Sequence, residues 1–141
     1  FANGAVVNVV DLVTETEVAT IDTFGVAQHE MVVSRTGRDL WIAQVTAAGL
    51  AQLVRIDVDR RSATRNTLRS TITLDPVVYS TSTGARGVGV TPDGGTVCVS
   101  LVEGPNHPTP ELVTLDAWTE TLVGAPIGVE SLPATVAVQT R

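Results

Sequence analysis

The sequence predicts an all-β fold built from repeated antiparallel units. Short segments rich in Val, Ile and Leu alternate along the chain with turn sequences containing Gly, Asp, Asn and Thr. This alternation is typical of short strands joined by tight turns. No stretch has the 3.6-residue apolar period of an amphipathic helix. One strand–turn–strand sequence, residues 7–21, also returns later in altered form.

The repeated sequence keeps its register over a long distance. Three pairs of equivalent residues are each separated by 105 positions: Asp11 and Asp116, Val18 and Val123, and Met31 and Val136. A third, more diverged copy begins at 53–57 and ends on Asp57. A repeat of about 40–45 residues with four short strands is typical of a propeller blade. The sequence therefore predicts a β-propeller of four-stranded antiparallel blades, with about three blades present.

Each expected strand has a local justification. The run 5–10 is almost continuously apolar and predicts a strand buried on both faces. Gly37 and the Asp93-Gly94 pair supply hairpin turns, whereas the Ser- and Thr-rich 75–84 and the Pro-rich 102–110 predict loops. The expected strands are 5–10, 18–21, 31–34, 39–44, 53–57, 68–74, 87–90, 96–101, 112–115, 122–123 and 135–138.

These strands divide the chain into incomplete and complete blades of one propeller domain. Residues 1–27 are the outer half of a blade, 28–84 a second blade with a long loop, 85–133 a third, and 134–141 the first strand of a further blade. Three repeats do not close a propeller, which usually needs about four to eight blades. Further blades of a longer chain are the preferred explanation, and a second copy associated head to tail is the alternative.

Several segments resemble the YVTN-type, WD40-like β-propeller repeat. The resemblance rests on Val9-Val10-Asp11-x-x-Thr14, Val18-Ala19-Thr20-Ile21 and Val90-Thr91-Pro92-Asp93-Gly94-Gly95-Thr96-Val97-Cys98-Val99-Ser100. Residues 34–37 lack the Pro-Asp of the pattern, and Trp41 and Cys98 stand at its tyrosine position. The resemblance covers nearly the whole chain and implies the same architecture as the repeat spacing.

Composition excludes several function classes. A net charge of -6 argues against a nucleic-acid partner, because phosphate binding needs clustered cations. The short basic group of Arg60, Arg61, Arg65 and Arg69 is interpreted as a solvated turn. No apolar run reaches the roughly 18 residues of a membrane-spanning helix. The single cysteine, Cys98, permits no internal disulfide and is expected to be a buried, inert thiol.

The repeated Asp residues and the two tryptophans have structural explanations. An Asp that follows a strand can accept backbone N–H groups two residues on, with a Thr hydroxyl closing the turn. Asp11 with Thr14, and Asp116 with Thr119, fit this role better than a metal site. Trp41 lies within a strand and is expected between blades, whereas Trp118 lies in a turn and is a candidate exposed contact or a cover for the blade edge.

The candidate binding residues follow from the resemblance, which implies that the innermost strands begin at the central channel. Five residues could share that rim: His29, Glu30, Arg86, Asn106 and His107. A His-Glu pair near an Arg could bind an anion or perform general acid–base chemistry. The residue types alone favour a polar channel filled with water. Two distant histidines without a ligand pattern predict no metal or cofactor.

The resulting functional hypothesis is a non-catalytic binding or scaffold module of a secreted or cell-surface protein. Its partner would be a protein or small ligand at the propeller face, and the resemblance implies an extracellular or periplasmic location. The alternative is a propeller enzyme, either a lactonase-like hydrolase or a redox domain with a metal or haem partner. Fold alone does not choose between them.

Overall fold

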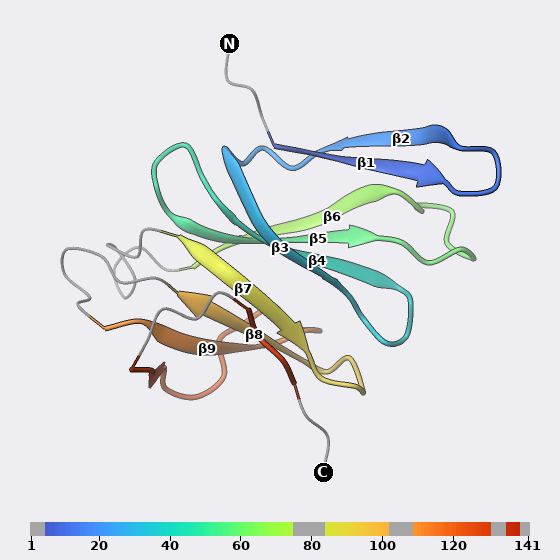
Figure 1. Ribbon diagram of the computed structural model, residues 1–141. Coiled ribbons are helices and arrows are strands. Elements are labelled where there is room, and N and C mark those ends of the chain that lie inside the picture. Colours follow the sequence, from blue (N-terminus) through green and yellow to red (C-terminus); the bar gives the residue numbers. More distant parts are fainter. Residues whose placement is uncertain (1–4, 75–83, 102–108, 131–134, 139–141) are drawn as a thin grey trace.

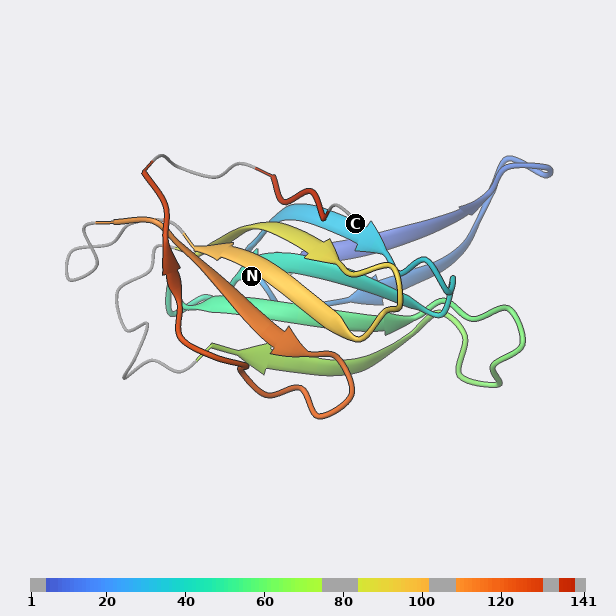
Figure 2. The same ribbon diagram turned by 90° about the horizontal axis from the view of Figure 1, so that it is seen from below.

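The computed structural model describes residues 5–74, 84–101, 109–130 and 135–138, and all regular structure in these ranges is β. Within these described ranges, ten strands form three antiparallel sheets, which are stacked face to face (Figures 1 and 2). The described residues contain no helix long and apolar enough to cross a membrane. The all-β prediction is confirmed.

Each sheet follows chain order, as a blade does. The first contains β1 (Val6–Asp11) and β2 (Thr16–Asp22). The second contains β3 (Ala27–Val33), β4 (Asp39–Val45), β5 (Ala51–Asp57) and β6 (Thr67–Thr73). The third contains β7 (Ala85–Val90), β8 (Thr96–Leu101), β9 (Glu111–Asp116) and β10 (Ile127–Gly128).

The repeated Asp closes the same turn in the first and third sheets. The Asp11 carboxylate accepts the N–H groups of Val13 and Thr14, at 2.7 and 3.2 Å. Asp116 accepts those of Trp118 and Thr119, both at 2.8 Å. The structural role predicted for the two acids is confirmed. These bonds to backbone N–H groups lower the pKa of both carboxyls.

The third copy of this turn is longer and holds a buried carboxylate. Asp57 is fully buried and accepts bonds from the backbone of Asp59, two hydroxyls and the Arg69 guanidinium, which lies 2.9 Å away. Burial acts to raise the Asp57 pKa, but the bonds from Ser62, Thr64 and Arg69 outweigh it and lower the pKa. The solvated-turn prediction is therefore wrong for Arg69.

Two apolar cores separate the three sheets. The larger lies between the second and third sheets, and the smaller joins the first sheet to the second. Trp41, only 1% exposed, belongs to the larger core, which confirms its predicted place between blades. Trp118 is 67% exposed. The larger core consists of Trp41, Ala43, Ala51, Leu53, Leu74, Ala85, Val88, Val97, Val99, Leu101, Val113, Leu115 and Ala117.

The first strand differs from its prediction. Val6 and Val10 are 46% and 50% exposed, and Val7 is the one buried residue of β1. The prediction of burial on both faces is wrong because the first sheet has two strands and packs one face on the second sheet. Cys98 in β8 was also predicted to be buried, and this prediction is confirmed only in part. Its side chain is half-buried, and this burial raises the pKa of the thiol.

The outer edge of the third sheet also differs. Leu122 makes a single bridge to Leu115, and Gly124 then adopts a left-handed conformation with φ of 73°. The predicted strand 122–123 is therefore reduced to this antiparallel bridge, with Val123 N–H bonding the Thr114 carbonyl at 2.8 Å, and β10 is the fourth strand of the sheet. The described segment 135–138, predicted as a strand, has no strand assignment.

Candidate functional site

The candidate rim is built on two bulges at equivalent positions. In the β3–β4 pairing, Gln28 and Glu30 face consecutive residues of β4, so His29 is the extra residue. Arg86 is the extra residue between Ala85 and Gly87 in the β7–β8 pairing. A bulge bends its strand and redirects the unpaired side chain. Both innermost strands therefore present an extra polar residue near their first residue, in adjacent sheets.

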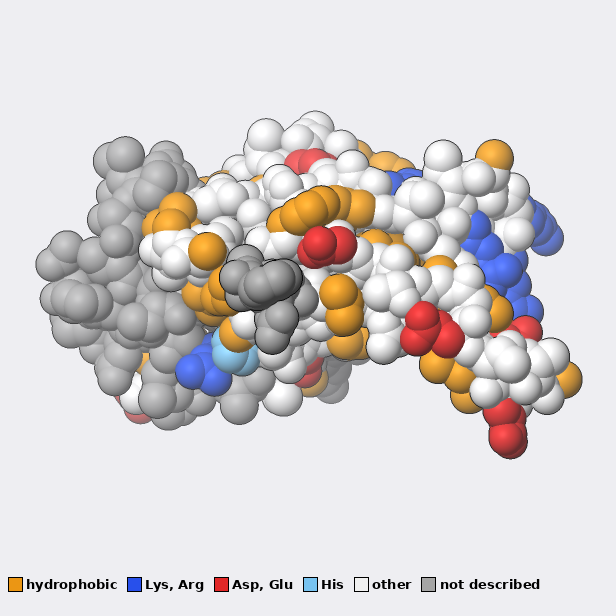
Figure 3. Space-filling view, turned by 90° about the horizontal axis from the view of Figure 1, so that it is seen from above, with side chains coloured by type: hydrophobic (Ala, Val, Ile, Leu, Met, Phe, Trp, Pro, Cys, Tyr) orange, Lys and Arg blue, Asp and Glu red, His pale blue; other side chains and the backbone are white. Residues whose placement is uncertain are grey.

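The two bulge side chains meet. Arg86 Nη1 lies 3.5 Å from His29 Nδ1, which is at the long end of hydrogen-bond distance. A guanidinium can only donate, so a bond here requires Nδ1 to accept and places the imidazole proton on Nε2. Both residues are exposed, and Figure 3 shows a His side chain against a basic one on this face. The pair thus offers N–H donors to solvent.

The electrostatics of the pair favour a neutral imidazole. Burial, and secondarily the positive charge of Arg86, lower the pKa of His29. No carboxylate among the described residues forms an ion pair with Arg86. The His29–Arg86 pair therefore has one permanent positive charge, on Arg86, and His29 adds a second positive charge only in acid.

Glu30 has a different role in the geometry. Its carboxylate Oε2 accepts the backbone N–H of Val88 at 2.8 Å, which links β3 to β7 across the sheet interface. Gly87 is required here, since a Cβ at that position would lie 2.7 Å from Ser100 Oγ and 3.1 Å from Glu30 Oε2. Glu30 thus holds the two bulge-bearing strands together beside His29 and Arg86.

Three of the five predicted rim residues are brought together: His29, Glu30 and Arg86. The other two, Asn106 and His107, lie outside the described residues. Within the ranges that the structure describes, no group of three or more His, Cys, Asp or Glu side chains is arranged to hold a metal ion. The bulges themselves were not predicted, because neither sequence carries a glycine at the extra residue that would mark one.

An arginine that the sequence analysis missed connects the second and third sheets. Arg55 Nε lies 2.9 Å from Asp39 Oδ1, and Nη1 bonds the Ala117 carbonyl at 3.0 Å and Glu120 Oε1 at 3.2 Å. Its guanidinium also stacks 5.2 Å from the Trp41 ring centroid. Burial acts to lower the pKa of Arg55, but the bonds to Asp39 and Glu120 outweigh it and raise the pKa. This arginine is structural.

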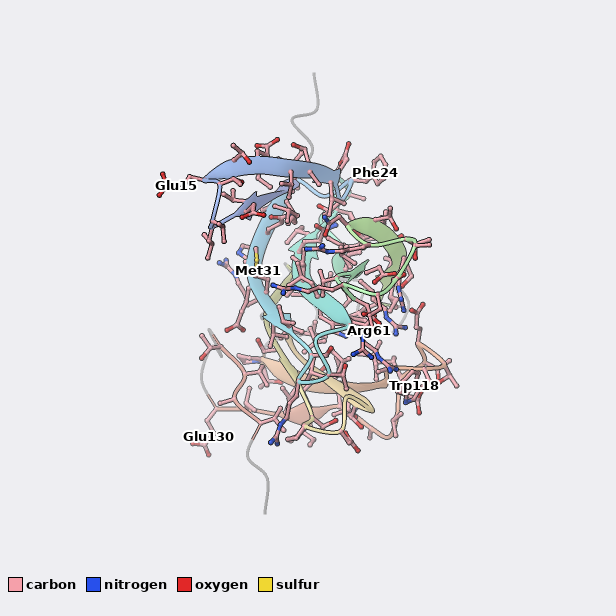
Figure 4. All side chains as sticks on the ribbon, turned by 90° about the vertical axis from the view of Figure 1, so that its right-hand side faces the viewer. Glu15, Phe24, Met31, Arg61, Trp118 and Glu130 are labelled. Carbon is pink, nitrogen blue, oxygen red and sulfur yellow. The ribbon has the colours of Figure 1, made fainter. Side chains whose placement is uncertain are left out.

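The opposite end of the molecule carries a cleft. A cleft of about 490 Å³ lies between the β1–β2 turn and the β5–β6 connection, with an apolar wall and the cations Arg60 and Arg65. Figure 4 shows Arg61, of the same connection, on the side of the molecule to which these turns point. The apolar and acidic part of the lining is Val9, Val10, Asp11, Leu12, Val13 and Val18.

Comparison with solved structures identifies the architecture. The chain is similar to hydrazine synthase from Kuenenia stuttgartiensis, with a TM-score of 0.69 and 16% identity over 90% of this chain. It is also similar to the dihydro-heme d1 dehydrogenase NirN in complex with DHE, with a TM-score of 0.66 and 18% identity over 90% of this chain. The fold is of the β-propeller type.

The likeness is confined to the fold and to part of each protein. The aligned region covers 36% of the hydrazine synthase chain and 24% of the NirN chain. No protein-family model and no curated protein sequence matches this chain. At this level of identity, the propeller architecture is what the comparison establishes.

Proposed function

We propose that this chain is part of a non-catalytic binding or scaffold propeller that recognises an anionic group at the rim formed by His29 and Arg86. The observation that carries the proposal is the meeting of two bulge side chains from adjacent sheets. An exposed guanidinium without an acidic partner among the described residues suits a carboxylate or phosphate. The anion would belong to a small ligand or to an acidic side chain of a protein partner.

The wider setting belongs to the same proposal. The repeat resembles the YVTN type, and this resemblance supports a secreted or cell-surface protein with an extracellular or periplasmic location. Propellers host many unrelated functions, so the rim chemistry carries more weight than the fold.

The test is titration of the protein with inorganic phosphate and with a short poly-glutamate peptide, followed by isothermal calorimetry and by NMR of the histidine ring. Arg86→Gln should weaken binding by about tenfold or more, because charge-assisted hydrogen bonds contribute roughly 1.5–3 kcal/mol. Arg61→Gln is the matched control, since Arg61 is exposed at the opposite end. Absence of saturable binding, or an equal loss in the control, would overturn the proposal.

The pH dependence supplies an independent readout. The His29 pKa is lowered from its usual value, so the imidazole is neutral near pH 7. Anion affinity should therefore increase as the pH falls through the lowered His29 pKa, and a bound anion should raise that pKa. His29→Gln should abolish the increase while retaining binding through Arg86. A pH profile unchanged in this variant would contradict a direct role for His29.

An enzyme is the second candidate. The two similar structures are named as a hydrazine synthase and a dihydro-heme d1 dehydrogenase. These names are the support for a propeller associated with redox chemistry. A lactonase-like hydrolase is the other enzymatic possibility. Metal and haem content and lactone hydrolysis should be measured for the wild-type chain and for His29→Ala and His107→Ala. Activity or bound metal lost in either variant would favour the enzyme over the binding module.

A further inference from the structure

The cleft between the first two sheets corresponds to a space that is filled between the second and third sheets. β1 and β5 both end at the repeated Asp, so Val9 of β1 is equivalent to Arg55 of β5. Arg55 crosses to the third sheet, where it bonds the Ala117 carbonyl and Glu120. Val9 has neither the length nor the donors to do the same. The cleft of about 490 Å³ is therefore left open by a difference between two copies of the repeat.

The β5–β6 connection supplies two cations to this cleft. It is longer than the equivalent turn between β1 and β2. The Ser62 and Thr64 hydroxyls bond the buried Asp57 carboxylate at 2.5 and 2.7 Å, which fixes the middle of the connection. Arg60 and Arg65 flank this fixed segment, and both line the cleft. Figure 2 shows the two turns projecting at the same end of the molecule, and Figure 3 shows basic side chains beside apolar ones there.

The charge of the cleft is positive on balance. No acidic side chain in the described ranges forms an ion pair with Arg60 or Arg65. The acid in the lining is Asp11, whose carboxylate already accepts the N–H groups of Val13 and Thr14. These N–H bonds, and to a smaller extent the two arginine charges, lower the pKa of Asp11. Two cations against one carboxylate leave one positive charge for a ligand anion.

The apolar wall of the cleft comes from the first sheet. Val9 packs against the smaller core and also lines the cleft. Val18 is the extra residue of a bulge, because its neighbours Ala19 and Glu17 pair with consecutive residues of β1. A bulge redirects the side chain of its extra residue. Val13, in the turn itself, completes the wall.

The exposure of this wall does not depend on further strands of the same blade. Val13 and Val18 correspond to Trp118 and Val123, which lie 105 positions later. The third sheet has its inner strands β7 and β8, and Trp118 and Val123 are nevertheless exposed. Val13 and Val18 have the second sheet beside them and are still 93% and 52% exposed. Exposure is thus a property of these two positions in the blade.

Two other residues of the lining behave differently. Val10 and Leu12 correspond to Leu115 and Ala117, which are both buried in the third sheet. Their exposure in the first sheet therefore carries no weight, and neither residue is needed for the site.

We propose that this cleft binds a small amphipathic carboxylate. Its carboxylate lies at Arg60 and Arg65, because guanidinium groups bind carboxylates with paired, charge-assisted hydrogen bonds. Its apolar chain lies along Val9, Val13 and Val18, where it removes apolar surface from water. The volume of about 490 Å³ is within the roughly 300–1,000 Å³ of small-molecule sites. The proposal is independent of anion binding at the rim, which lies at the opposite end of the molecule.

The probe that tests the proposal is octanoate, titrated into methyl-labelled protein and followed by NMR. Octanoate should bind saturably at one site, with the largest shifts at the methyl groups of Val9, Val13 and Val18. Octan-1-ol has the same chain without the charge and should bind at least about tenfold more weakly. Acetate has the charge without the chain and should also bind at least about tenfold more weakly. Octan-1-ol binding as tightly as octanoate, or octanoate shifts centred elsewhere, would overturn the proposal.

Variants of the exposed residues separate the cleft from general charge. Arg60→Gln and Arg65→Gln should each weaken octanoate binding by about fivefold or more and leave octan-1-ol binding unchanged. Val13→Asp should weaken octanoate binding by about tenfold or more, because it adds a like charge to the apolar wall. Arg35→Gln is the matched control, since Arg35 is exposed, lies outside the lining and gives the same change in net charge. An equal loss in Arg35→Gln, or no saturable octanoate binding to the wild-type chain, would contradict a site in this cleft.

Discussion

At the scale of single residues, buried charge is concentrated between the second and third sheets. Asp39 and Asp57 are directly paired on β4 and β5, and like charges in that position repel. Arg69 approaches both acids, at 3.4 and 2.9 Å, and Arg55 binds Asp39 from the other side. The two arginines offset the repulsion and extend the network across the blade interface to Glu120.

Arg55→Met should destabilise the protein by about 3–5 kcal/mol, because it leaves Asp39 buried without its closest cation. Urea unfolding measures the effect. Arg38→Met is the control: its partner Asp59 is 3.8 Å away and the Arg38 side chain is 63% exposed, so the loss should stay within about 1 kcal/mol. If both variants lost the same free energy of unfolding, Arg55 would act only through its positive charge and not through its bond to the buried Asp39.

The importance of Arg55 could not be predicted from the sequence. It stands in the run Leu53-Val54-Arg55-Ile56, where a single arginine is typical of an exposed strand position. Its partners Ala117 and Glu120 lie 62 and 65 residues away in the chain. The burial of Trp41 was predictable because it lies in the apolar run Leu40-Trp41-Ile42-Ala43, and burial of a large aromatic needs no specific partner.

At the scale of elements, the turn before each outer strand repeats a backbone feature as well as an Asp. Glu15, Asn66 and Glu120 each precede an outer-edge residue and have φ of 54°, 62° and 57°. This left-handed conformation is unfavourable for Glu and tolerated by Asn and Gly. Asn66 therefore suits this backbone conformation, whereas Glu15 and Glu120 are strained in it.

Glu15→Gly and Glu120→Gly should have opposite effects, although the backbone change is the same. Glu15→Gly should relieve strain and stabilise the protein by up to about 1 kcal/mol. Glu120→Gly should destabilise it, because the Glu120 carboxylate bonds Arg55 and accepts the Ser70 hydroxyl at 2.7 Å. Thermal unfolding of both variants measures the difference. A destabilised Glu15→Gly variant would contradict the strain argument.

Elements were predictable where the signal is local. The Asp turns were predicted because the acid, its N–H donors and its Thr lie within a few residues. Residues 122–123 resemble β2 by register and do bridge to β9, but Gly124 and Pro126 follow them, and the pairing continues only at β10. The bulges at His29 and Arg86 were missed, because a bulge is a property of the pairing and not of one strand.

At the scale of the whole molecule, the three sheets are joined with unequal strength. The larger core unites the second and third sheets, and β4 and β5 are buried along almost their whole length. The first sheet is attached through the smaller core and through a polar contact. Gln44 is fully buried, accepts the Thr23 hydroxyl at 2.8 Å and donates to the Thr23 carbonyl at 2.9 Å.

Native-state hydrogen exchange should therefore show two levels of protection. Amides of β4, β5 and β8 should exchange only on global unfolding, whereas those of β1 and β2 should exchange through opening of the first sheet alone. Gln44→Leu should accelerate the β1 and β2 amides by about tenfold or more, because the Thr23 carbonyl loses the Gln44 donor at roughly 1–3 kcal/mol, while the Thr23 hydroxyl keeps the Ala5 carbonyl.

The neighbouring amide provides the control for this last prediction. Gln52→Leu removes the acceptor that lies 2.6 Å from the Gln44 amide but leaves the Thr23 contacts in place. It should affect the β1 and β2 amides less than Gln44→Leu does. Gly25 makes the contact specific, since a Cβ there would lie 2.6 Å from Gln44 Cδ. If β1 and β2 exchange with the global rate in every variant, the first sheet is an integral part of the folding unit and the two-level description is wrong.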